Sequence, residues 1–132
     1  MTYSITEVAK KFGMTAHTLR YYDKEGLMPY VERSSSGIRK FKDRDFEWLN
    51  IINCLKASGV PVKKIKEFVD WCMEGDNTIE KRLEFLQNHK KDVENQLSEL
   101  NKHMEMIDYK IGYYKAAAAA GTVAIHNKTA DN

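Results

Sequence analysis

The chain has 132 residues, of which 42% are hydrophobic and 30% charged, a composition typical of a soluble folded protein and not of a disordered one. No apolar run reaches the roughly 18 residues of a membrane span, and no charged-then-apolar leader begins the chain, so we expect a cytoplasmic protein without membrane contact. Its two cysteines, Cys54 and Cys72, make neither a disulfide framework nor a Cys-x-x-Cys pair.

The net charge of +2 hides an uneven distribution. Residues 1–44 hold nine Lys or Arg and five Asp or Glu, a net +4. Residues 45–115 hold eleven and thirteen, a net −2, and residues 116–132 hold one of each. The positive excess therefore lies at the N-terminal end, where it favours a phosphate-binding surface.

Two short helices are predicted first. Residues 4–7, Ser-Ile-Thr-Glu, match a capping box that begins a helix, and Gly13 ends that helix. Thr15 is a capping residue for a second helix over residues 16–25, which Gly26 ends. Two short helices around such a turn indicate a helix-turn-helix.

A basic hairpin is predicted next. Residues 30–33 and 38–42 have strand character and flank a Ser-Ser-Ser-Gly turn. Arg33, Arg39, Lys40 and Lys42 make this hairpin basic, so we interpret it as a wing beside the helix-turn-helix.

Two further helices follow the hairpin. The first begins at Asp43 or Arg44 and runs to about residue 57, where a Ser-Gly-Val-Pro sequence breaks it. The second covers about residues 62–73. Asn77, three residues before Glu80, is expected to cap the helix after it.

A long heptad seam dominates the C-terminal half. Its steps alternate between four and three residues, and Lys90 is its only polar member. The seam consists of Ile79, Leu83, Leu86, Lys90, Val93, Leu97, Leu100, Met104, Ile107, Ile111 and Tyr114. A helix of this length, about 54 Å, cannot bury such a face on a small domain, so the seam predicts a homodimer. Packing along its own domain is the alternative.

Three stretches carry a resemblance to a known family. Residues 4–9 (Ser-Ile-Thr-Glu-Val-Ala), residues 18–29 (Thr-Leu-Arg-Tyr-Tyr-Asp-Lys-Glu-Gly-Leu-Met-Pro) and residues 37–41 (Gly-Ile-Arg-Lys-Phe) resemble the MerR family of bacterial transcription regulators. Ile38 and Phe41 stand where that family usually has tyrosines.

The resemblance implies a mainly α fold in four parts. These are a winged helix-turn-helix (residues 1–43), a helical connector (44–75), a helix that dimerises as an antiparallel coiled coil (76–118) and a flexible tail (119–132). It also implies a homodimer that distorts double-stranded promoter DNA and so acts on RNA polymerase through the promoter.

The second helix is expected to enter the major groove and the wing to meet phosphates. Tyr22 is interpreted as a core aromatic. The candidate DNA contacts are His17, Thr18, Arg20, Tyr21, Arg33, Arg39 and Lys40.

The sensor prediction rests on the cysteines. His89, His103 and His126 show no recognised ligand spacing and are interpreted as surface residues, so no metal site is expected. Cys72 lies on the apolar stripe of its helix and is predicted to be in the core, whereas Cys54 lies off its stripe. Residues 53–59 and 72–79 are similar to the aldehyde- and thiol-stress branch of MerR regulators, the AdhR and NmlR group. That similarity implies a stress-response regulator whose Cys54 reacts with electrophiles such as aldehydes, although a small buried hydrophobe is the alternative.

Other functions remain open. A drug-like ligand could bind noncovalently at the dimer interface among Trp48, Phe68, Trp71, Tyr109, Tyr113 and Tyr114. A coiled-coil adaptor that never contacts DNA is an alternative of a different class. No Gly-rich phosphate loop, paired catalytic histidines or nucleophile elbow is present, so we expect no enzyme, no catalytic residues and no cofactor.

Overall fold

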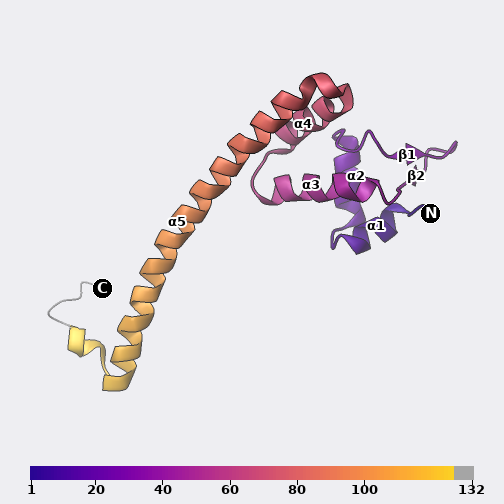
Figure 1. Cartoon of the computed structure of the whole chain (residues 1–132). Helices are drawn as coiled ribbons and strands as arrows, with labels where there is room; N and C mark the ends of the chain where they lie inside the picture. The colour runs from indigo at the N-terminus through magenta and orange to yellow at the C-terminus, as the bar shows by residue number, and fades with distance from the viewer. Residues whose placement is uncertain (127–132) are drawn as a thin grey trace. The chain divides into compact units, whose positions relative to one another are not determined.

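The computed structural model describes residues 1–126 and divides the chain into two compact units, Met1–Leu86 and a second that begins at Gln87. The first unit holds two short helices, a hairpin and two longer helices (Figure 1). Their bounds are α1 Ile5–Lys11, α2 Ala16–Lys24, β1 Glu32–Arg33, β2 Arg39–Lys40, α3 Asp45–Ala57 and α4 Val62–Glu74. None of the helices in the described part of the chain has the length and apolarity of a membrane span.

The helix-turn-helix begins as predicted. The hydroxyl of Ser4 accepts a hydrogen bond from the backbone N–H of Glu7 at 3.2 Å, and the Glu7 carboxylate accepts one from the N–H of Ser4 at 2.8 Å. Gly13 makes the turn with a φ of 65°, and Thr15 accepts a bond from the N–H of Thr18 at 3.1 Å. Both predicted caps are thus confirmed, and they satisfy N–H groups that a helix start leaves unpaired.

The hairpin is shorter than predicted. Glu32 pairs with Lys40 and Arg33 with Arg39 in an antiparallel ladder, and Gly37 turns between them with a φ of 85°. The backbone of Phe41 instead exchanges hydrogen bonds with Tyr3, at 2.8 and 3.1 Å, in an isolated bridge. These bonds lie on the edge of Phe41 that faces away from β1, so they do not compete with the hairpin ladder. The ladder ends at Glu32 because the chain turns just before it, where the N–H of Val31 donates to the carbonyl oxygen of Met28 at 3.3 Å.

The helices α3 and α4 supply six of the buried apolar residues of the core. The helix α3 begins at Asp45 with Arg44 as its N-cap, within one residue of the predicted start at Arg44. The carboxylate of Asp45 accepts a hydrogen bond from the N–H of Lys42 in the preceding turn, at 2.8 Å. The largest fully buried apolar side chains of the core are Val8, Leu19, Leu27, Phe41, Leu49, Ile52, Leu55, Ile65 and Val69. This core joins the helix-turn-helix, the hairpin and the connector helices into one packed body.

The junction between α4 and the long helix differs from the prediction. Asn77 was expected to be an N-cap, but it lies inside a 3-10 turn, η1 Asp76–Thr78. Thr78 is the buried residue of this turn, and its hydroxyl lies 2.5 Å from the carbonyl oxygen of Trp71 and 2.8 Å from that of Gly75. The expectation for Asn77 was wrong, because Asn77 is the middle residue of the 3-10 turn and not the residue before the first turn of α5.

The long helix α5 spans Ile79–Ala120. Nine apolar seam residues have exposed fractions of 37 to 59%: Ile79, Leu83, Leu86, Leu97, Leu100, Met104, Ile107, Ile111 and Tyr114. Lys90 is exposed and Val93 half-buried. The seam is therefore open along the helix, as a face awaiting a partner would be.

The predicted tail begins inside α5. Residues 119 and 120 are its last helical residues, and a 3-10 helix, η2, follows at Val123–His126. The remainder of the predicted tail, residues 127–132, lies outside the described residues, as does the side chain of His126.

We predict that Ser4→Ala lowers the free energy of unfolding by about 1 kcal/mol, because the capping box loses its acceptor. Denaturant unfolding followed by circular dichroism, at one protein concentration, measures the change. Ser35→Ala at the exposed hairpin tip is the matched control and should leave the midpoint unchanged. Equal midpoints for the two variants would contradict the assignment of the cap.

Candidate nucleic-acid interface

The helix α2 has one buried face and one open face. Leu19 and Tyr22 are buried in the core, which confirms the prediction for Tyr22. Burial raises the pKa of the Tyr22 hydroxyl. His17, Arg20 and Tyr21 are exposed, and Tyr21 is 44% accessible. Three of the four predicted contacts on α2 therefore lie where a ligand could reach them.

Thr18, the fourth predicted contact on α2, is tied to the start of its own helix. It is half-buried, and its hydroxyl lies 2.9 Å from the hydroxyl of Thr15. Any contact from Thr18 to DNA would therefore share this hydroxyl with the helix cap.

The wing is joined to α2 by one carboxylate. Oδ2 of Asp23 accepts hydrogen bonds from Nη2 of both Arg33 and Arg39, each at 2.5 Å. The side chain of Asp23 is 15% exposed and that of Arg39 is 21% exposed. Nη1 of Arg33 also donates to the carbonyl oxygen of Gly37 at 3.0 Å. Asp23 thus connects the last turn of α2 to both strands of the hairpin.

Asp23 was missed by sequence reasoning. An acidic residue in a basic segment was the available signal, since the segment carries only five acidic residues among its first 44. Asp23 is important for the wing because it is the salt-bridge partner of Arg39, a side chain that is only 21% exposed. The Nε of Arg39 is buried and has no hydrogen-bond partner. Arg33 and Arg39 therefore stabilise the wing itself through these bonds.

The remaining basic side chains near the hairpin fall into two groups. Lys40 is exposed, as a phosphate contact would be. Lys42 and Arg44 both pair with one carboxylate oxygen of Glu32, at 2.6 and 2.5 Å. The hydrogen bond from Lys42 lowers the pKa of Glu32. Neither Lys42 nor Arg44 was a predicted DNA contact.

The two departures from the family's wing tyrosines have different positions. Ile38 is 66% exposed at the wing tip, whereas Phe41 is fully buried. Ile38 therefore presents an apolar surface where a hydroxyl is usual, and Phe41 contributes to the core.

The two thiols differ in accessibility. Cys54 on α3 is exposed. Cys72 was predicted to be in the core and is half-buried against it, where burial raises the pKa of its thiol despite the nearby Arg82. Cys54 is thus the more accessible thiol.

Three aromatic residues of the alternative ligand pocket, Trp48, Phe68 and Trp71, pack on other rings of the first unit. Tyr30 and Trp48 stack with their ring centroids 5.2 Å apart. Phe68 stacks on Phe85 at 5.4 Å, and Trp71 meets the same ring edge-on at 6.0 Å. These contacts explain the aromatics of the first unit as packing.

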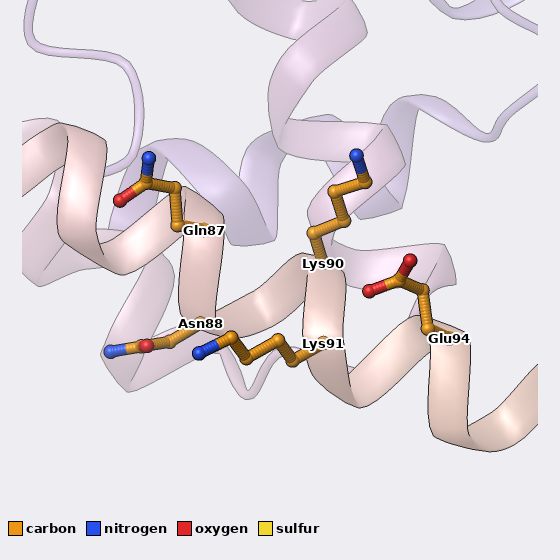
Figure 2. Close-up of a pocket in the computed structure, with 5 residues that line it drawn as sticks. All are labelled: Gln87, Asn88, Lys90, Lys91 and Glu94. Atoms are coloured by element: carbon orange, nitrogen blue, oxygen red, sulfur yellow. The ribbon is translucent and has the colours of Figure 1, made fainter.

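Open hollows lie along α5, and one of them is lined by Asp108, Tyr109, Gly112 and Tyr113. Among residues 1–126, no three His, Cys, Asp or Glu side chains form a group that could hold a metal ion. An open hollow on α5 is lined only by polar side chains, namely Gln87, Asn88, Lys90, Lys91 and Glu94 (Figure 2).

We predict that Asp23→Asn lowers the free energy of unfolding by about 1–3 kcal/mol, because a charged acceptor is lost to a half-buried arginine. Chemical denaturation at one protein concentration measures this. The control is Glu32→Gln, whose partners are exposed and which should cost less. An equal or larger loss in the control would refute the special role of Asp23.

Comparison with known protein families gives a clear match. The model of the MerR helix-turn-helix regulatory proteins matches residues 3–70. A helix-turn-helix transcriptional regulator from Haemophilus influenzae is 43% identical over 127 residues, which cover 96% of this chain and 94% of the relative. The regulator AdhR of Bacillus subtilis is 42% identical over 83 residues, which cover 63% of this chain and 59% of AdhR.

Solved structures agree with this match. HiNmlR, described as a MerR family regulator lacking the sensor domain and bound to promoter DNA, matches with a TM-score of 0.87 and 43% identity, over 95% of this chain and 99% of HiNmlR. A MerR family regulator from Bacillus thuringiensis matches with a TM-score of 0.78 and 40% identity, over 85% of this chain and 98% of that structure. The chain belongs to the MerR family of helix-turn-helix transcription regulators.

Proposed function

We propose that this protein binds promoter DNA as a homodimer, distorts it and responds to thiol-reactive electrophiles. The DNA-binding part is carried by one observation, the match to HiNmlR bound to promoter DNA over 95% of this chain. The open face of α2 and the accessible Lys40 support it.

The DNA contacts follow from the two faces of α2. Its buried residues anchor the helix in the core, so His17, Arg20 and Tyr21 are available for base edges and phosphates in a major groove. Lys40 on β2 is available for a neighbouring phosphate. Asp23 holds the wing against α2, so groove and backbone contacts are positioned together.

The homodimer is supported by the open seam of α5. A parallel pairing in register would stack Lys90 against Lys90 of the partner subunit and would set Lys110 beside Lys115 of the partner subunit. An antiparallel pairing separates these like charges. We therefore propose an antiparallel coiled coil, which carries one DNA-binding unit at each end.

Promoter distortion is the proposed mode of regulation. Two DNA-binding units on one duplex can repay the deformation energy of the DNA through added backbone contacts. The protein would then act on RNA polymerase indirectly, through the shape of the promoter, in the cytoplasm and without catalysing a reaction.

We predict that Lys40→Ala weakens binding to operator and to unrelated DNA by similar factors and reduces the salt slope by about 1. Arg20→Ala should cost about 1–3 kcal/mol on the operator and less on unrelated DNA. Fluorescence anisotropy at several salt concentrations measures both effects. Lys91→Ala on α5 is the control and should change neither affinity nor salt slope; equal losses in all three variants would overturn this binding face.

The proposed sensor is Cys54. Its thiolate would attack the carbonyl carbon of an aldehyde, forming a sulfur–carbon bond while the carbonyl electron pair moves to oxygen and takes up a proton. This addition needs no oxidant. The exposure of Cys54 supports the assignment, as does the similarity to AdhR.

We predict that Cys54→Ser abolishes the promoter response to formaldehyde or methylglyoxal, while Cys72→Ser retains it. A promoter-reporter assay measures the response, and DNA footprinting of each variant without electrophile checks that binding is intact. Unchanged induction in Cys54→Ser would sink the sensor assignment and leave the DNA-binding proposal standing.

The two alternatives have less support. A noncovalent ligand at the dimer interface would have to displace the ring partners Tyr30 and Phe85 from Trp48, Phe68 and Trp71. Its contacts on α5 would come from Tyr109, Tyr113 and Tyr114. An adaptor that never contacts DNA fits poorly with membership of a family of DNA-binding regulators.

A further inference from the structure

We propose a specific register for the dimer, in which Leu97 lies opposite Leu100 of the partner subunit. This inference rests on the proposed antiparallel homodimer and adds the alignment of the two chains. It follows from the open seam of α5 and from the charges that flank it.

The seam alone permits two registers one heptad apart. The proposed register also sets Lys90 opposite Ile107 of the partner subunit. The competing register sets Leu97 opposite Val93 of the partner subunit. Each leaves a single seam residue, at one end, without a seam partner. Because both registers bury nearly the same apolar residues, apolar burial does not choose between them.

The flanking residues favour the proposed register. In the heptads of α5 the d positions include Ile79, Leu86 and Val93, and each is followed by an e position. In an antiparallel pair the e positions of the two helices face one another. The proposed register therefore sets Glu80 beside Lys115 of the partner subunit, an attractive pair that the two-fold symmetry repeats. It also sets Gln87 beside Asp108 of the partner subunit, without a like-charged contact.

Figure 2 shows how these flanking residues are presented. The side chains of Gln87 and Glu94 extend on the same side of α5 as Lys90, which belongs to the seam. Residues at these positions therefore border the seam and would meet the flank of a second helix. In the proposed register Glu94 meets Asn101 of the partner subunit, a neutral side chain.

The competing register brings like charges together. It sets Glu80 beside Asp108 of the partner subunit and Glu94 beside Glu94 of the partner subunit. On the other flank it sets Arg82 beside Lys110 of the partner subunit. Like charges directly opposite across an interface destabilise it, and all three contacts lie at solvent-exposed or half-exposed positions.

Short-range cross-linking distinguishes the registers. In a chain carrying Cys54→Ser and Cys72→Ser, Gln87→Cys and Asp108→Cys chains are co-expressed and treated with a short bismaleimide. The proposed register predicts a covalent dimer from the mixture and none from either variant alone. Glu94→Cys alone should not cross-link, because its two copies would lie about 13 Å apart along the helix axis.

The outcomes separate the register from the dimer. A covalent dimer from Glu94→Cys alone, with none from the mixture, would overturn the proposed register in favour of the competing one. A dimer by sedimentation that cross-links in neither experiment would also overturn it. A monomer by sedimentation would overturn the proposed homodimer itself.

A charge swap gives a second measurement. Glu80→Lys should raise the dimer dissociation constant about tenfold in the proposed register, because two attractive pairs become repulsive. Glu80→Lys combined with Lys115→Glu should recover the original value. In the competing register the lysine of Glu80→Lys would lie beside Asp108 of the partner subunit. Adding Lys115→Glu would then not recover the original dissociation constant, and that result would contradict the proposal.

Discussion

The constraint on which the rest depends is the apolar face of α5. A helix of 42 residues exposes most of this face in the single chain. Exposing apolar side chains to water is unfavourable in free energy, so burial of this face would stabilise the protein. A second copy of the helix is a partner of matching length and chemistry. The proposed dimer and the alignment of its flanking charges both follow from burying this one surface.

Within the first unit, the carboxylate of Asp23 has a comparable organising role. It joins the end of α2 to both strands of the hairpin through Arg33 and Arg39. The side chains that most resemble phosphate contacts in the sequence are thereby partly neutralised before DNA is present. The exposed positive charge of the proposed interface is left to residues such as Arg20 and Lys40.

The two thiols illustrate how position on a helix decides the accessibility of a side chain. Cys54 and Cys72 lie on neighbouring helices of the same core, yet one is exposed and the other is half-buried with a raised pKa. Helical periodicity predicted this ordering, because Cys72 lies on its helix's apolar stripe and Cys54 does not. The proposed electrophile sensing depends on that difference.

The sequence by itself determined the caps at Ser4 and Thr15, the helices, the family and the heptad seam, because these depend on neighbours within a few residues or on one regular period. Tertiary structure decided the rest. Tyr3 paired with Phe41 beside the hairpin, a 3-10 turn took in Asn77 before α5 begins, and Asp23 bound the wing arginines. Each of these depends on groups brought together by packing, and the two pairings join segments distant along the chain, for which local propensity and periodicity carry no signal.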